Sequence, residues 1–146
     1  MKPKTLTILS IIIFIALIIL AIYIINLEDY KESSEEGIYV SKVIDGDTFE
    51  MSDNSIIRLL CVDAPERGKT GYKEAKDFLT DMILDKEVRL EKDISEEDEY
   101  GRLLRYVYVN ISNIEIFVNQ QIVQEEYGKI FRYGDDTSKC DEIEGK

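Results

Sequence analysis

Three short segments of this sequence carry residue types that could perform chemistry. They are I-D-G-D-T at residues 44–48, R-L-L-C-V-D-A-P-E at residues 58–66 and Y-G-R at residues 100–102. Each has an ordinary interpretation by itself, because Asp-Gly is a common hairpin turn, a strand can end in solvated charges, and a glycine between polar residues marks a turn. Chemistry at these segments would use carboxylates, guanidinium groups, tyrosine or a bound hard metal ion.

The composition excludes several classes of enzyme. The chain of 146 residues contains no histidine, and its only cysteines are Cys61 and Cys140. Without imidazole, Ser-His-Asp hydrolases, Cys-His proteases and nucleases that depend on histidine are excluded. Two cysteines cannot form a four-thiolate zinc site or a dense disulfide framework.

The charge balance limits how the chain could bind a polyanion. The chain has 18 basic and 30 acidic residues and a formal net charge of −12. Such a charge opposes tight, extended binding of nucleic acid, whose affinity comes largely from neutralised phosphates. A small cationic site is still compatible with it, because charges farther away than roughly 8–10 Å are largely screened.

Taken together, the three segments resemble the staphylococcal nuclease (thermonuclease) family over about residues 38–133. The matching elements are I-D-G-D-T, R-L-L-x-V-D-x-P-E and D-x-Y-G-R, followed by Val118-Asn119 at the start of a later helix. The resemblance implies a calcium-dependent endonuclease that hydrolyses phosphodiester bonds to 3′-phosphate products. It also implies a monomeric domain whose substrate is single-stranded DNA or RNA.

The resemblance further implies which residues hold the metal. Asp47 and Asp63 match the carboxylate ligands of a single Ca²⁺, and the carbonyl of Ala64 matches a third protein ligand. Ca²⁺ prefers carboxylate, carbonyl and water oxygens, so these groups suit it. Ala64 stands where the family often has threonine, which removes a hydroxyl group and keeps the carbonyl.

The catalytic and substrate-binding residues are implied in the same way. Glu66 matches the general base, and Arg58 and Arg102 match two arginines that bind the phosphate. Planar guanidinium groups can hold phosphate oxygens through paired hydrogen bonds. Tyr100 and Tyr133 are the expected substrate-binding residues. A second tyrosine that flanks the nucleotide in the family is expected to be replaced here by arginine, because Arg132 occupies its probable position.

One geometric condition must be met for this site to form. Strict alternation along a strand would place Arg58 and Asp63 on opposite faces of a sheet. They can share a site only if the strand bends or bulges before Asp63, and Pro65 makes such an irregularity plausible.

The elements that must position these residues can be read from the periodicity of the chain. Strands are predicted at residues 39–44, 48–51, 56–62, 87–90 and 103–109, with helices around residues 75–83 and 118–127. The predicted fold is therefore α+β and mainly β. We expect a five-stranded OB-type Greek-key barrel with two packed helices, preceded by one N-terminal transmembrane helix.

The hydrophobicity pattern, together with the resemblance, predicts five successive regions. They are a cytoplasmic N-terminus (1–5), a transmembrane signal-anchor helix (6–27), a linker (28–37), a staphylococcal-nuclease-like domain (38–134) and an acidic C-terminal tail (135–146). As a helix, residues 6–27 would span about 33 Å, enough for a bilayer core. Because Lys2 and Lys4 precede this run and Glu28 follows it, we expect a single-pass protein of the cell membrane with an extracytoplasmic catalytic domain. The alternative is secretion after cleavage near residue 27.

Two questions remain open, one about the cysteines and one about the function. Cys61 and Cys140 could form a disulfide in an oxidising exterior, or Cys61 could be a small core residue. The domain could also be a catalytically weak or silent module that binds nucleic acid, or a structural or chaperone-like membrane protein. Retention of Arg58, Glu66 and Arg102 favours the enzyme.

Overall fold

The computed structural model describes residues 14–23 and 37–145, which belong to two compact units, Met1–Gly37 and Ile38–Lys146. In the first unit, residues 14–23 are helical. The rest of the predicted transmembrane segment, most of the predicted linker and the cytoplasmic N-terminus lie outside the described residues. No helix within the described ranges is long and apolar enough to cross a membrane.

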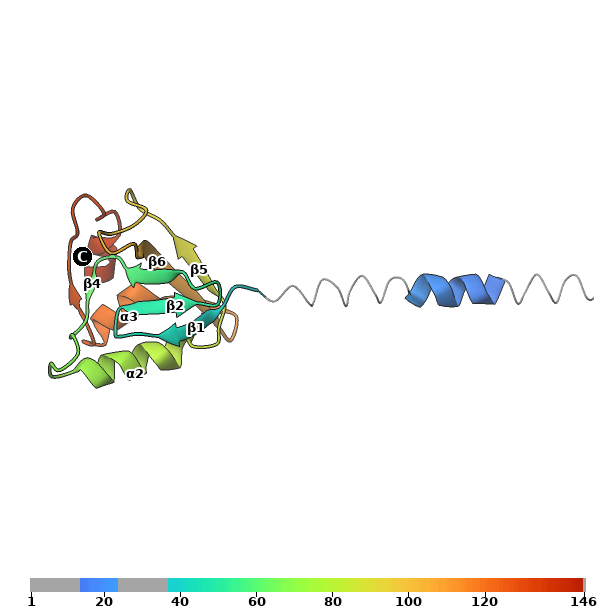
Figure 1. Ribbon diagram of the computed structural model, residues 1–146, viewed down its shortest axis with the longest axis horizontal. Helices are drawn as coiled ribbons and strands as arrows, with labels where there is room; N and C mark the ends of the chain where they lie inside the picture. The colour runs from blue at the N-terminus through green and yellow to red at the C-terminus, as the bar shows by residue number, and fades with distance from the viewer. Residues whose placement is uncertain (1–13, 24–36, 146) are drawn as a thin grey trace, which may run out of the picture. The chain divides into compact units, whose positions relative to one another are not determined.

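The second unit is a small domain of short strands and helices (Figure 1). In chain order its elements are β1 (Val40–Val43), β2 (Thr48–Met51), β3 (Ile56–Leu59), β4 (Val62–Asp63), α2 (Tyr72–Ile83), β5 (Val88–Glu91), β6 (Leu103–Ile111), β7 (Ile114–Phe117), α3 (Val118–Gln124), β8 (Lys129–Ile130) and α4 (Cys140–Glu144).

The strands form one large mixed sheet and one small ladder. Their order in the large sheet is β1-β2-β3-β6-β5, with β7 also paired to β6, while β4 and β8 pair separately. Only β3 and β6 run parallel; the other paired strands are antiparallel. The long strand β6 pairs with β3 through Arg105 and with β5 from Tyr106 onward, so it belongs to two parts of a curled sheet.

The predicted fold class is confirmed as a mainly β, OB-like mixed sheet with packed helices, but the predicted closed barrel is not. The edge strands β1 and β5 are joined by one isolated bridge, between Tyr39 and Glu87. A single bridge does not continue the ladder around a barrel. The structure also contains β4, β7, β8 and α4, so the prediction of five strands and two helices was incomplete.

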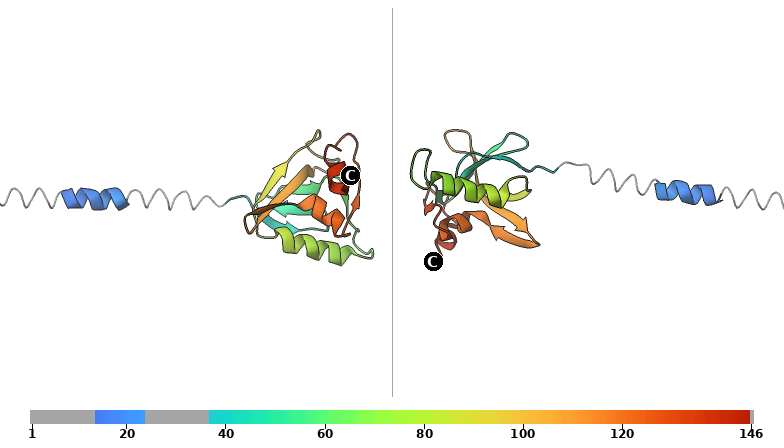
Figure 2. Two further views of the ribbon diagram at one scale, coloured as in Figure 1. Left: turned by 180° about the vertical axis from the view of Figure 1, so that it is seen from behind. Right: turned by 90° about the horizontal axis from the view of Figure 1, so that it is seen from below.

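The core lies on both sides of β6. Because side chains alternate along a strand, Val107 and Val109 point into the larger apolar cluster, and Leu104 and Tyr106 point into the smaller one. Helix α2 runs alongside β1 (Figure 2) and buries Leu79 and other apolar side chains in the larger cluster. Its apolar spacing of three and four residues is the pattern that predicted this helix.

The smaller cluster contains a disulfide between Cys61 and Cys140, whose Cα atoms lie 5.3 Å apart. The pairing that the sequence left open is therefore present in the structure. Cys140 begins α4, and both Cys140 and Ile143 are fully buried. The region expected to be an acidic tail thus packs on the domain, against α3 and β8.

Asn119 joins α3 to the strands beside it. Its side-chain oxygen accepts the backbone N–H of Val107 at 2.8 Å, and its amide nitrogen donates to the carbonyls of Leu60 at 2.8 Å and Arg105 at 3.3 Å. The side chain is fully buried. Because Leu60 closely follows the strand that carries Arg58, this side chain links the core to the segment richest in candidate site residues.

We expect Asn119→Ala to lower the free energy of unfolding by about 1–3 kcal/mol, because it leaves a buried N–H and a buried carbonyl without partners. Urea unfolding followed by circular dichroism measures the effect. Gln124→Ala is the matched control, since Gln124 is exposed at the end of the same helix. Equal stability of the two variants would contradict the assigned role.

Candidate active site

The bend required between Arg58 and Asp63 is present. Strand β3 ends at Leu59, and β4 begins at Val62 after a turn in which Cys61 has a φ of 61°. This left-handed conformation reverses the alternation of side chains across the break. As a result, a guanidinium nitrogen of Arg58 lies 3.8 Å from a carboxylate oxygen of Asp63. The break occurs earlier than Pro65, at Leu60–Cys61.

Asp47 is the most tightly held carboxylate of the site. Its Oδ2 accepts the backbone N–H of Ala64 at 2.7 Å and lies 2.8 Å from Nη1 of Arg58, while its Oδ1 accepts the Thr48 hydroxyl at 2.9 Å. Thr48 on β2 is paired with Arg58 on β3, and this register brings the carboxylate of the adjacent Asp47 close to the Arg58 guanidinium. Burial raises the pKa of the Asp47 carboxyl to about 6, although the charge of Arg58 opposes this rise.

Gly46 lets the loop that carries Asp47 approach the rest of the site. A Cβ at this position would lie 2.7 Å from the Cβ of Ala64 and 2.7 Å from the Cβ of Ala75 in α2. Both distances are shorter than real contacts of this kind. The glycine is therefore required by close packing, which its interpretation as a simple Asp-Gly turn did not reveal.

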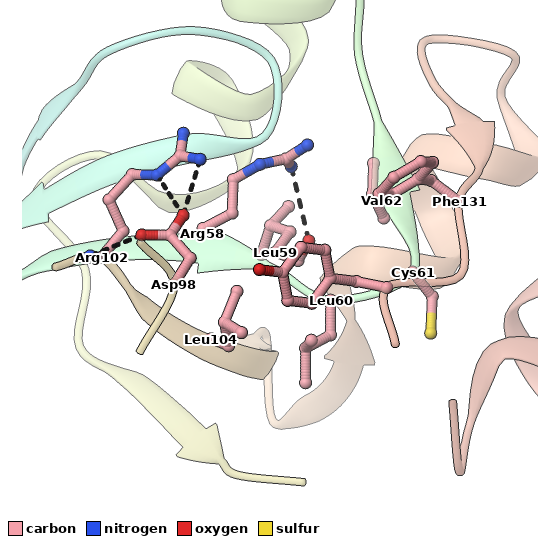
Figure 3. Close-up of a pocket in the computed structure, with 10 residues that line it drawn as sticks. Arg58, Leu59, Leu60, Cys61, Val62, Asp98, Arg102, Leu104 and Phe131 are labelled. Atoms are coloured by element: carbon pink, nitrogen blue, oxygen red, sulfur yellow. Dashed lines mark hydrogen bonds and ion pairs between the residues drawn. The ribbon is translucent and has the colours of Figure 1, made fainter. Parts of the chain in front are cut away.

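Arg102 is oriented by Asp98, as Figure 3 shows. Both Nε and Nη2 of Arg102 lie 2.7 Å from Oδ2 of Asp98, and the backbone N–H groups of Tyr100 and Arg102 donate to Oδ1. Burial raises the pKa of the Asp98 carboxyl, but the hydrogen bonds from Arg102 and Tyr100 outweigh it and lower the pKa overall. The sequence analysis assigned no role to Asp98, although it is the aspartate of the D-x-Y-G-R element.

The predicted catalytic and metal-binding residues converge on one pocket of about 120 Å³. Its lining residues are Asp45, Asp47, Arg58, Asp63, Ala64, Pro65, Glu66 and Arg102. Glu66 is exposed at this pocket, in a turn in which its carbonyl accepts the N–H of Lys69. Asp45 is the one acidic lining residue to which the sequence analysis gave no role.

A second pocket, of about 140 Å³, shares both arginines with the first (Figure 3). Its further lining residues are Leu59, Leu60, Cys61, Val62, Asp98, Leu104, Phe131 and Tyr133. The pocket therefore combines aliphatic side chains from three strands and a turn with two aromatic rings from the chain after β8.

The structure divides the predicted substrate-binding residues. Tyr133 lines the second pocket, whereas Tyr100 lines neither pocket and is exposed, with its ring centre 5.2 Å from the Arg102 guanidinium. Arg132, which stands at the probable position of a family tyrosine, lines neither pocket, and its guanidinium pairs with Asp141 and Glu144. Phe131 is the aromatic neighbour that the sequence analysis missed; alternation in an extended chain would have paired it with Tyr133.

The first pocket contains oxygen donors of the type that a hard cation prefers, but they are not gathered into a metal site. Carboxylates of Asp45, Asp47, Asp63 and Glu66 line it together with Ala64. Within residues 14–23 and 37–145, no three His, Cys, Asp or Glu side chains are grouped closely enough to hold a metal ion. Arg58 lies between two of these carboxylates, those of Asp47 and Asp63, and supplies the positive charge there.

Comparison with known sequences agrees with the geometry. The sequence model of a family described as "Staphylococcal nuclease homologue" matches residues 56–145, a range that includes Arg58, Asp63, Glu66 and Arg102 and begins after Asp47. A thermonuclease of Staphylococcus hyicus is 36% identical over 88 residues, which cover 54% of this chain and 52% of that protein. A thermonuclease of Staphylococcus intermedius is 34% identical over 120 residues, covering 73% of this chain and 71% of that protein.

A micrococcal nuclease of Shigella flexneri is also similar, with 32% identity over 106 residues that cover 64% of this chain and 58% of that protein. The chain thus spans about half the length of the Staphylococcus hyicus protein and more of the other two.

The low pKa of Asp98 predicts a pH-dependent contribution to stability. Its ion pair with Arg102 stabilises the fold fully above the ordinary carboxyl pKa of about 3.9, and this contribution is lost as the pH falls through the lower native pKa. We expect Asp98→Asn to lower the free energy of unfolding at pH 7 by about 1–3 kcal/mol. The deficit should shrink in acid, where wild-type Asp98 is also neutral.

Urea unfolding between pH 7 and pH 2 tests this expectation, because the pH must fall below the lowered native pKa of Asp98. Glu99→Gln provides the control, because it removes one exposed negative charge from the neighbouring position. A deficit for Asp98→Asn that does not change with pH would show that its charge contributes nothing.

Proposed function

The chain belongs to the staphylococcal nuclease family, and on this premise we propose that it is a calcium-dependent endonuclease. It would hydrolyse phosphodiester bonds of single-stranded DNA or RNA and leave 3′-phosphate ends. One observation carries the proposal. Arg58, Arg102 and Glu66 line one pocket together with the two expected metal ligands, Asp47 and Asp63.

Arg58 and Arg102 would bind the phosphate. Asp47 holds the first guanidinium at 2.8 Å and Asp98 holds the second at 2.7 Å. A guanidinium has five N–H donors, so donors remain on both arginines for the non-bridging oxygens of a phosphate. Because both groups are oriented before substrate arrives, they can stabilise the charge that develops on the phosphate with little reorganisation.

Glu66 would act as the general base. Its carboxylate is exposed at the pocket, one residue after Pro65, where water has access. In the proposed reaction it takes a proton from the water that attacks phosphorus, and the P–O5′ bond breaks to give a 3′-phosphate and a 5′-hydroxyl. One arginine would also stabilise the leaving oxygen, which would take a proton from solvent water to become the 5′-hydroxyl. Positioned base catalysis typically contributes about 10²–10⁴-fold.

The charge of the pocket supports a metal requirement. Four acidic and two basic side chains line it, so an entering phosphate meets an excess of negative charge. Asp47, Asp63 and the Ala64 carbonyl are the groups that would hold Ca²⁺. When bound, a calcium ion neutralises negative charge on a phosphate and acts as a Lewis acid.

The second pocket supports a single-stranded substrate. The exposed rings of Phe131 and Tyr133 suit the flat, apolar face of a base, and the pocket adjoins both arginines. A base can enter such a pocket only when it is unstacked and unpaired. The net charge of −12 opposes long contacts with a duplex backbone.

The decisive experiment measures cleavage of single-stranded DNA and of RNA with Ca²⁺ and with a chelator. We expect cleavage only with Ca²⁺, and about 10²–10³-fold slower turnover for Glu66→Gln and Arg102→Ala. Glu74→Gln, an exposed glutamate in α2, should retain wild-type rates. Near wild-type rates for both site variants would refute the mechanism. Binding of nucleic acid without cleavage by wild type would instead support the alternative that the domain is a catalytically silent binding module.

We further propose that residues 6–27 tether the domain to the outer face of the cell membrane. The proposal is supported by the uninterrupted apolar run and by the lysines before it. Protease added to intact cells should remove the domain from the cell surface. Complete protection of the domain would contradict this orientation, and recovery of a soluble form that starts near residue 28 would indicate cleavage.

A further inference from the structure

The chain from Phe131 to Cys140 is attached to the same residue at both of its ends. At one end, the backbone N–H of Phe131 donates to the carbonyl of Cys61 at 3.1 Å. At the other end, Cys140 forms the disulfide with Cys61. We call residues 131–139 the aromatic loop, because Phe131 and Tyr133 are the rings that line the second pocket.

Burial holds these two rings only weakly. Phe131 is 49% exposed and Tyr133 is 41% exposed. Their loop also contains neither a helix nor a strand. The polar contacts of the loop lie between Tyr133 and Cys140. The Asp136 carboxylate accepts the N–H groups of Ile94 and Ser95 at 2.8 and 2.7 Å, the Ser138 N–H donates to Asp93 at 3.0 Å, and Lys139 pairs with Glu91. The position of the rings therefore depends on how this stretch, which ends in the disulfide, is fastened.

The groups that would carry out hydrolysis are held independently of this loop. Arg58 is paired with Asp47, and Arg102 is paired with Asp98. Neither Phe131 nor any other residue of the aromatic loop lines the first pocket. Loss of an attachment of the aromatic loop should therefore change how a base is bound and leave the hydrolytic groups in place.

We propose that the Cys61–Cys140 disulfide is a positioning device that holds Phe131 and Tyr133 at the second pocket and so sets the affinity for nucleic acid. This inference rests on the proposed nuclease function. Opening the disulfide would remove the covalent attachment at one end of the aromatic loop, leave only the polar contacts of Asp136, Ser138 and Lys139, and let the rings move away from the base. The expected signature is a higher KM with an unchanged kcat, which a purely stabilising crosslink would not produce.

Cys140→Ala is the suitable variant. Replacing Cys61 would also alter the left-handed turn between β3 and β4, which brings Arg58 and Asp63 together. In the full chain with Ca²⁺, we expect its KM for single-stranded DNA to rise by about 5- to 100-fold, the range for loss of base stacking. Its kcat should stay within about twofold of wild type, since no hydrolytic group moves. Phe131→Ala should raise KM similarly, and the double variant should be no worse than Phe131→Ala alone, because both changes remove the same contact.

Ile143→Ala is the matched control for lost stability. Ile143 is buried in α4 beyond the disulfide, so its truncation destabilises the helix without opening the loop. Its KM should equal that of wild type. If Cys140→Ala does not fold, wild-type protein reduced with a phosphine below its unfolding temperature provides the same comparison with the oxidised form.

The outcomes separate this inference from the function on which it rests. If oxidised wild type does not cleave, the nuclease proposal fails, and affinity for single-stranded DNA measured by fluorescence anisotropy still tests the positioning role. If wild type cleaves and the KM is unchanged by opening the disulfide, the positioning role alone is overturned. Additive effects of Cys140→Ala and Phe131→Ala would likewise overturn it.

Discussion

A carboxylate removed from water must be matched by hydrogen-bond donors or a positive charge, and the architecture around the candidate site meets this demand for Asp47. Its partners come from separate places: Arg58 on β3, Ala64 just after β4, and the adjoining Thr48 on β2. Burial still prevails over these partners and raises the pKa of Asp47 to about 6. Without them, the cost of burying an ionised carboxylate would be far larger. One buried charge thus ties together the segments that line the pocket.

The same arrangement depends on the break at Leu60–Cys61, and the break is held from the core. The Leu60 carbonyl accepts a hydrogen bond from the buried amide of Asn119, and the Leu60 N–H donates to Arg105 on β6. Cys61 is joined to Cys140 of α4. Because packed interiors deform little, the hydrogen bonds at Leu60 transmit the rigidity of the core to Arg58 on one side of the break and to Asp63 on the other. Core packing and site geometry are therefore parts of one structure.

Much of the candidate site could be predicted from the sequence alone. The order and spacing of the three motifs identified the family and the residues that later proved to share one pocket, with Arg58, Glu66 and Arg102 among them. Helix α2 and the mainly β class also followed from periodicity, since a buried face must repeat with the period of its element. Even the bend before Asp63 was foreseeable, because two residues that alternate to opposite faces cannot otherwise meet. These features depend on neighbours in the chain, which the sequence displays directly.

Only the tertiary structure decided features that depend on residues far apart in the chain. The pairing of Cys61 with Cys140 spans 79 positions, and Asp-Gly at Gly46 resembled a turn until Ala64 and Ala75 were seen to leave no room for a Cβ. Strand β7 escaped notice because its hairpin turns through Ser112 and Asn113, which adopt φ values of 54° and 64° without the usual glycine. The structure also brings Phe131 to the second pocket beside Tyr133, while Arg132 between them pairs with Asp141 and Glu144. Closure of the barrel, too, depends on how the edge strands β1 and β5 meet. Local patterns of residues carry no information about the separation of these two strands.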